Sequence, residues 1–204
     1  MALQNATEEQ LSLSRTRAAF YKKVIERYRE AISVGEQKTI PQLKELILPN
    51  DDAVQKKKQE LLEEIGVAEF EKDFLKYASK AAEYCHSLSH IEAQLPAPFW
   101  LSPKEIVELH AADEFDGAIL LCSLLQAAGC DSAAVRVLQL EGSLEHPIVV
   151  FSSSNKHFYA DVSQSNKVKA MPENALEELQ EFSYEGKKFV SQKYEFDERE
   201  YVEF

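Results

Sequence analysis

The spacing of apolar residues changes once along the chain, at about Gly129. Before this glycine they recur at steps of three and four residues, as in Ala18, Tyr21, Ile25 and Tyr28, which is the period of an amphipathic helix. After it come short runs rich in β-branched and aromatic residues, separated by turns, which indicate strands. Helices followed by consecutive strands predict an α+β fold, with the helices packed on an antiparallel sheet.

The same patterns predict individual elements. Gly35, Gly66 and Gly129 mark the ends of three predicted helices, and Ser102 with Glu105 forms a capping box that opens another. Helices are expected at about 7–33, 52–65, 68–91, 103–110, 113–128 and 172–182, with a short segment at 40–48. Strands are expected at 133–140, 146–151 and 157–162, and one or two more at 188–194 and 201–204.

A chain of 204 residues can bury a single core. We expect a helical N-terminal extension over 1–66, a core over 67–170, and a C-terminal helix and strands over 171–204 that complete this core.

The composition excludes several classes of function. A net charge of -12 repels phosphate groups, so neither nucleic acid nor an anionic membrane surface is an expected partner. No apolar run approaches the roughly 20 residues that span a bilayer, and the first residues do not have the pattern of a signal peptide. Three cysteines in such a chain suggest reduced thiols and a cytoplasmic location. No glycine-rich phosphate-binding motif occurs, and no cofactor is expected.

The most specific motif is the acidic start of an apolar helix, Asp113-Glu114-Phe115-Asp116-Gly117-Ala118, which continues as Ile-Leu-Leu and ends before Gly129. It resembles the helix that opens the catalytic core of transglutaminase-like domains and related bacterial cysteine proteases. Asp113, Asp116 and Ala118 fall on matching positions of that family's motif. The nucleophilic cysteine of the family falls on Glu114.

Three further segments extend the resemblance in the same order. The run 100–105 looks like the approach to this helix, and 145–150 looks like the strand that supplies the catalytic imidazole. The run 158–162 looks like the strand that supplies the carboxylate. The resemblance implies a papain-like fold of the transglutaminase type, in which His146 is the base and Asp161 orients it.

With Glu114 in the place of the thiol, two functions are considered. A carboxylate is a weak nucleophile, and its attack on an amide would give an anhydride, so the chain is expected to be a pseudoenzyme that binds a protein or peptide. The alternative is a hydrolase in which Glu114, His146 and Asp161 act with a divalent metal or an activated water. Acidic residues also favour the first turn of any helix, so Asp113, Glu114 and Asp116 fit a capping role as well.

The resemblance makes a geometric prediction. Glu114 should lie in the first turn of its helix, with an oxygen within about 4 Å of one His146 nitrogen, and Asp161 should reach the other nitrogen. Nothing in the sequence sets an oligomeric state.

The remaining thiols and imidazoles have simpler explanations. Cys85 and Cys122 lie on the packing faces of their helices and Cys130 begins a loop, so buried, inert thiols are expected. His86 and His90 are four residues apart and could share a metal, but no third ligand lies nearby in the sequence.

Overall fold

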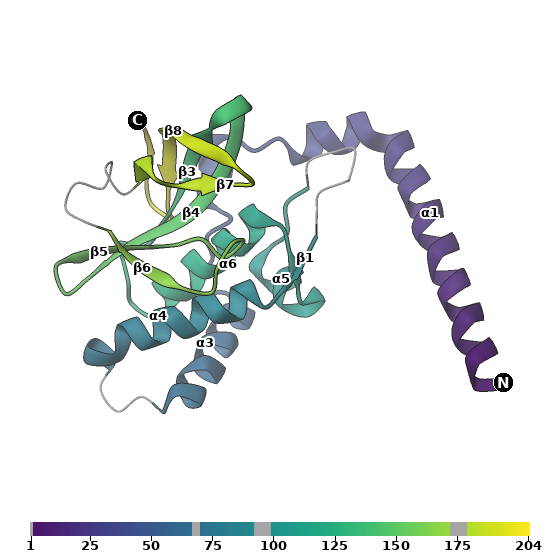
Figure 1. Ribbon diagram of the computed structural model, residues 1–204, viewed down its shortest axis with the longest axis horizontal. Coiled ribbons are helices and arrows are strands. Elements are labelled where there is room, and N and C mark those ends of the chain that lie inside the picture. Colours follow the sequence, from purple (N-terminus) through teal and green to yellow (C-terminus); the bar gives the residue numbers. More distant parts are fainter. Residues whose placement is uncertain (1, 67–69, 92–98, 172–178) are drawn as a thin grey trace. The chain divides into compact units, whose positions relative to one another are not determined.

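A computed structural model describes residues 2–66, 70–91, 99–171 and 179–204 (Figure 1). The chain forms two compact units. The first consists of Met1–Gln37 and Glu92–Trp100, and the second of Lys38–Ile91 and Leu101–Phe204.

The first unit is built on one long helix. α1 spans Ala2–Glu36, 35 residues, and so begins earlier and ends later than predicted from the apolar spacing. The indole nitrogen of Trp100 donates a hydrogen bond of 3.1 Å to the carbonyl oxygen of Glu36 at the end of this helix.

The second unit contains the other helices of the described chain. Their boundaries follow local capping chemistry, as at Asp51, whose carboxylate accepts from the backbone N–H of Ala53 at 2.8 Å. Gly66 ends the same helix with a φ of 60°, and the predicted capping box at Ser102 is present. The helices are α2 (Ile40–Lys44), α3 (Asp52–Ile65), α4 (Phe70–His86), α5 (Pro103–Leu109) and α6 (Glu114–Ala127).

The sheet is antiparallel, as predicted. Its order is β6-β5-β4-β3-β8-β7, and β9 also pairs with β8. The strands are β3 (Ala134–Leu140), β4 (Leu144–Ser153), β5 (Lys156–Ala160), β6 (Val168–Met171), β7 (Ser183–Tyr184), β8 (Lys187–Phe196) and β9 (Tyr201–Glu203).

The helix α6 is the centre of this unit. It packs against α3, α4 and α5 and against strands β3 and β4, so it lies between the other helices and the sheet (Figure 1). Ten consecutive residues of α6, from Asp116 to Leu125, are buried, which explains why its sequence is apolar on all sides. Because α6 is packed on all sides, its first turn has a fixed position relative to the sheet.

Several elements differ from the sequence-based prediction. α4 ends at His86, because Ser89–His90 form strand β1, which pairs in parallel with β2 (Ala111–Ala112). The short strands β6 and β7 were not predicted, and α3, expected in the N-terminal extension, packs on α4 and α6 in the second unit. The helix expected at 172–182 falls mostly outside the described residues. No helix in the described chain combines the length and apolarity that crossing a membrane requires.

Candidate functional site

The first turn of α6 carries the acidic motif. Asp113 precedes the helix and its carboxylate accepts a hydrogen bond of 2.8 Å from the backbone N–H of Asp116, as an N-cap does. Glu114 is the first residue of the helix, where the sequence placed it. The side chain of Glu114 therefore projects from a fixed helix N-terminus.

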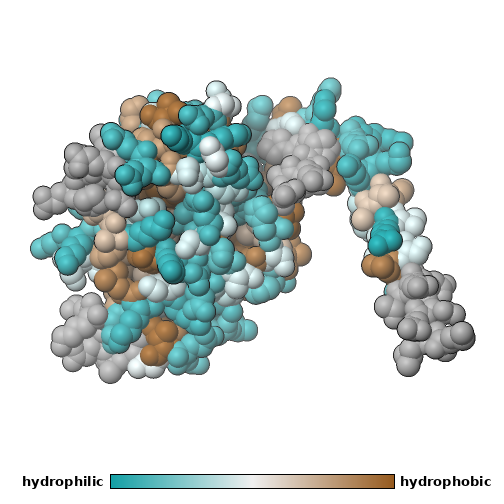
Figure 2. All heavy atoms as spheres, viewed as in Figure 1, coloured by the Kyte–Doolittle hydropathy of each residue, from teal (hydrophilic) through white to brown (hydrophobic). Residues whose placement is uncertain are grey.

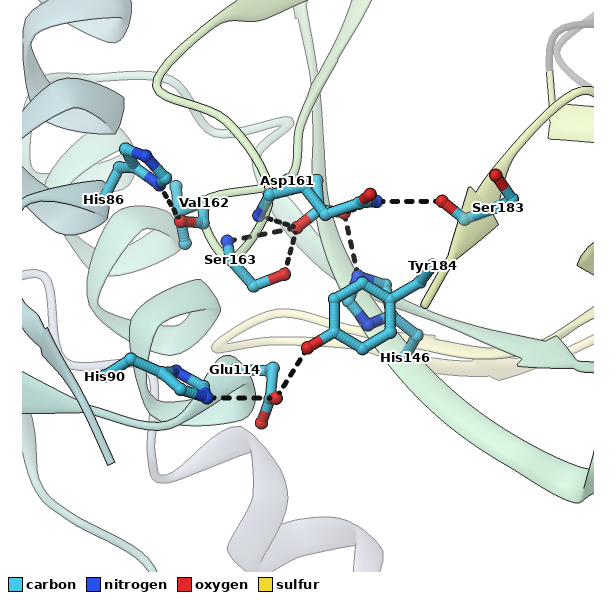
Figure 3. Close-up of polar contacts among 10 residues, drawn as sticks. His86, His90, Glu114, His146, Asp161, Val162, Ser163, Ser183 and Tyr184 are labelled. Atoms are coloured by element: carbon cyan, nitrogen blue, oxygen red, sulfur yellow. Dashed lines mark hydrogen bonds and ion pairs between the residues drawn. The ribbon is translucent and has the colours of Figure 1, made fainter. Parts of the chain in front are cut away.

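His146 and Asp161 form a buried pair. His146 lies on β4 and Asp161 directly follows β5, the neighbouring antiparallel strand. The imidazole Nε2 and the Asp161 Oδ2 are 2.9 Å apart, and the two residues are only 1% and 6% exposed (Figure 3). The expected contact between His146 and Asp161 is thus present.

Further hydrogen bonds surround Asp161. Its Oδ1 accepts from the backbone and hydroxyl of Ser163 and from the backbone of Gln164, and its Oδ2 accepts from the Gln164 amide at 2.7 Å. Burial alone would raise the pKa of Asp161, but the hydrogen bonds from His146, Ser163 and Gln164 outweigh it and hold this pKa below its usual range. Asp161 is therefore an anion that holds the imidazole in place through Nε2.

The predicted contact between Glu114 and His146 is wrong. Oε1 of Glu114 accepts a hydrogen bond of 2.9 Å from the hydroxyl of Tyr184 and lies 3.6 Å from Nε2 of His90. Within the described chain, Glu114 and His146 form neither a hydrogen bond nor an ion pair. Tyr184 takes the place of the expected partner, and it is 70 residues away in sequence, where no local pattern reveals it.

Tyr184 also covers the imidazole. Its ring is stacked on that of His146, with 4.0 Å between the ring centroids and 28° between the planes (Figure 3). Phe182 lies on the same imidazole, with a centroid distance of 5.6 Å. Desolvation, together with the hydrogen bond to Glu114, raises the pKa of Tyr184 above its usual value, so its hydroxyl stays protonated and donates.

A two-residue turn presents Tyr184. β7 and β8 are joined by Glu185 and Gly186, which both have positive φ, 50° and 77°, and Tyr184 pairs with Lys187. Two consecutive positive φ values are the geometry of a type I′ hairpin turn, which matches the twist of the strands. Tyr184 is the functional residue that sequence analysis missed, although the Glu-Gly turn after a tyrosine was a usable signal for a hairpin.

The polar groups do not fit a divalent metal. Among the described residues, no three His, Cys, Asp or Glu side chains are grouped so that they could hold an ion. Nε2 of His146 is directed at Asp161, and both oxygens of Asp161 already accept hydrogen bonds. His86 and His90 do not point toward a shared metal position either. His86 contacts the carbonyl oxygen of Val162 at 2.7 Å, and His90 contacts Glu114.

The three cysteines are free and buried, as expected. Burial raises the pKa of the Cys85 thiol far above its usual range and does the same for Cys122. Sγ of Cys122 donates to the carbonyl oxygen of Ala133, on the side of α6 that faces the sheet. These thiols have the character of packing residues rather than nucleophiles.

A second carboxyl of the motif is buried behind the helix start. Oδ1 of Asp116 accepts from the backbone N–H of Leu101 at 3.1 Å and so ties the segment before α5 to α6. Desolvation, reinforced by the nearby charge of Asp113, raises the pKa of Asp116 to about 7. Asp116 therefore holds the segment before α5 against the start of α6.

Two cavities lie near the site, and Asp161 lines the larger of them. One of about 130 Å³ lies at the start of α6 and is bordered by His86, His90, Asp113 and Gly117. The other, about 420 Å³, opens beyond Asp161 and Gln164. Both are large enough for a side chain of a bound peptide.

Comparisons with known proteins agree with this architecture. Neither a protein-family model nor a curated protein matches the sequence. Among solved structures, Legionella pneumophila LapG is similar, with 16% sequence identity, a TM-score of 0.51, and coverage of 81% of this chain and 88% of LapG. An EGTA-treated LapG structure gives 15% identity and a TM-score of 0.51 over 81% of this chain and 86% of LapG. The likeness is one of fold, and it shows that this chain has an α+β architecture like that of LapG.

Proposed function

We propose that this protein is a transglutaminase-like domain that carries out no thiol chemistry and acts by binding a protein or peptide. One observation carries the proposal: the residue at the start of α6, beside a histidine–aspartate pair, is a glutamate held by Tyr184 and His90. In the transglutaminase-like motif that this helix resembles, the nucleophilic cysteine occupies the position of Glu114.

The chemistry of the site supports binding rather than acyl transfer. A carboxylate that accepts a hydrogen bond from a tyrosine is a still weaker nucleophile than a free one, because the bond stabilises its charge. The cysteines offer no substitute, since all three are buried, and burial raises the pKa of the Cys85 and Cys122 thiols.

The helix α1 supports a protein partner. Its side chains at Leu11, Phe20, Tyr21, Tyr28 and Val34 are all more than half exposed. Figure 2 shows apolar patches among the polar surface along this helix. Exposed apolar residues in such number are typical of interaction surfaces. Between residues 15 and 30 the helix also carries six basic and two acidic residues in an otherwise acidic chain, which favours a partner with acidic groups. A cytoplasmic location, where the thiols stay reduced, belongs to the same proposal.

The substitution Glu114→Cys tests the proposal directly. It places a thiol at a helix N-terminus and removes the acceptor that holds Tyr184 on His146. The helix N-terminus stabilises a thiolate, and so does an imidazole that the thiol can approach once Tyr184 is released. We expect a thiol pKa well below the usual value of about 8.5, measured as the pH dependence of iodoacetamide reactivity. Adding His146→Ala should raise this pKa again.

Ser12→Cys provides a matched control, because Ser12 is an exposed position inside α1 and should give an ordinary thiol pKa. If the thiol at position 114 also titrates normally and does not respond to His146→Ala, Glu114 is a capping residue and the proposed relation to a thiol site is wrong.

A further inference from the structure

The hairpin formed by β7 and the start of β8 lies over the His146–Asp161 pair (Figure 3). Its tyrosine ring is in stacking contact with the imidazole on one face. Because His146 is only 1% exposed, no ligand reaches this imidazole while the ring is in place.

Two side-chain hydrogen bonds near the pair fasten β7, and the backbone N–H of Lys188 at the start of β8 also donates to Glu141. The hydroxyl of Tyr184 donates to Glu114 on α6 at 2.9 Å. The amide of Gln164 donates to the carbonyl oxygen of Ser183 at 3.1 Å, and the same amide nitrogen contacts Asp161. The first bond crosses from the sheet to the helix, and the second joins the hairpin to the loop that carries Asp161.

The stacked ring and the Asp161 contact cover different parts of the imidazole. Nε2 is directed at Asp161, whereas Tyr184 lies against the ring face. Movement of Tyr184 would therefore expose the face of the imidazole and leave its contact with Asp161 in place. β7 is only two residues long and lies at the edge of the sheet, as is typical of segments that open locally, whereas β8 stays paired with β3.

We propose that the β7–β8 hairpin is a latch, in which the bond between Tyr184 and Glu114 keeps the His146–Asp161 pair closed until a bound peptide displaces the tyrosine. This inference rests on the proposed peptide-binding function and adds its regulation. It also gives Glu114 a role in the closed state, as the acceptor that holds the latch.

Carbethoxylation by diethyl pyrocarbonate measures how accessible the His146 imidazole is in the absence of any ligand. The modification rates of His146 and His157 are determined by peptide mass analysis in the full chain, and their ratio is compared among variants. His157 is exposed on β5 and serves as the internal standard. In the wild type the ratio of the His146 rate to the His157 rate should be low. In Tyr184→Ala it should rise by about tenfold or more, because the reagent then reaches His146 without waiting for the hairpin to open.

Tyr184→Phe keeps the ring and removes only the fastening bond, and Glu114→Ala removes this bond together with the contact between Glu114 and His90. Both should raise the ratio by a smaller factor than Tyr184→Ala. Tyr201→Phe is the matched control, because the Tyr201 hydroxyl donates to Glu203 on β9 in a similar tyrosine–glutamate bond. It should leave the ratio unchanged.

If Tyr184→Phe and Glu114→Ala both retain the wild-type ratio, the bond does not hold the hairpin and the latch is disproved, even if Tyr184→Ala does not fold. This outcome is independent of the proposed function, which fails instead when the Glu114→Cys thiol titrates normally.

Discussion

Single buried carboxyls in this protein differ sharply in how they respond to pH. Asp161 is stabilised as an anion by its donors, whereas Asp116 lies in a dry environment near Asp113 and has a pKa of about 7. Both side chains are almost fully buried. The difference lies in the number of hydrogen bonds, five to Asp161 and few to Asp116, because each donor favours the charged form.

Asp116 should therefore make the protein less stable as the pH rises from about 4 to about 7. In this window the folded state keeps the proton that the unfolded state, with an aspartate pKa of about 3.9, has lost. At about 1.4 kcal/mol for each pKa unit, the loss is on the order of 4 kcal/mol. Asp116→Asn should abolish most of it, measured as the difference in the free energy of unfolding by urea between about pH 4 and pH 8.

Asp131→Asn is the control, because its carboxylate is exposed and pairs with Arg199 at the surface. Asp161 does not interfere, since its pKa is lowered and its contribution to stability is lost only as the pH falls below about 4. Equal pH dependence in the wild type and Asp116→Asn would show that the carboxyl of Asp116 titrates normally.

At the scale of secondary structure, the hairpin that carries Tyr184 depends on its turn. Gly186 has a φ of 77°, which an L-residue with a Cβ adopts at a cost of about 1–2 kcal/mol. Gly186→Ala should lower the free energy of unfolding by about this amount, measured with urea. It should also raise the modification of His146, because a distorted turn misplaces Tyr184.

Gly35→Ala is the matched control at a glycine without positive φ, where an added Cβ meets nothing within 4 Å. It should not destabilise the protein and should leave His146 protected. A Gly186→Ala variant as stable as the wild type would show that the turn tolerates a Cβ.

Local chemistry explains which elements could be predicted from the sequence. Asp51, Gly66 and the Ser102 capping box set helix ends through contacts within a few residues, and these ends are confirmed. The two-residue strands β1 and β7 depend on partners far away in the chain, which no window of sequence contains. The same holds at the site: Asp161 lies one hairpin from His146, whereas Glu114 is bound by a tyrosine from a distant hairpin.

For the whole molecule, the division into two units predicts that the second can fold alone. The core around α6 and the sheet lies entirely within it. A chain of residues 38–204 should unfold cooperatively in urea with a midpoint close to that of the full protein. The only tryptophan, Trp100, loses the carbonyl of Glu36 as acceptor, so its fluorescence maximum should change in the folded state.

In this experiment circular dichroism follows the unfolding of the truncated chain, and tryptophan fluorescence follows the surroundings of Trp100. A truncated chain without a cooperative transition would mean that α1 is needed for the fold of the second unit.

The stacking of Tyr184 on His146 also has a spectroscopic consequence. Protons held above the face of a ring are shielded by its circulating electrons, and the Tyr184 centroid is 4.0 Å from the imidazole. The carbon-bound protons of His146 should therefore resonate far upfield of those of the exposed histidines. This single shifted signal would identify the imidazole without isotope labelling of individual residues, and it would return toward ordinary values in any state in which Tyr184 has moved away.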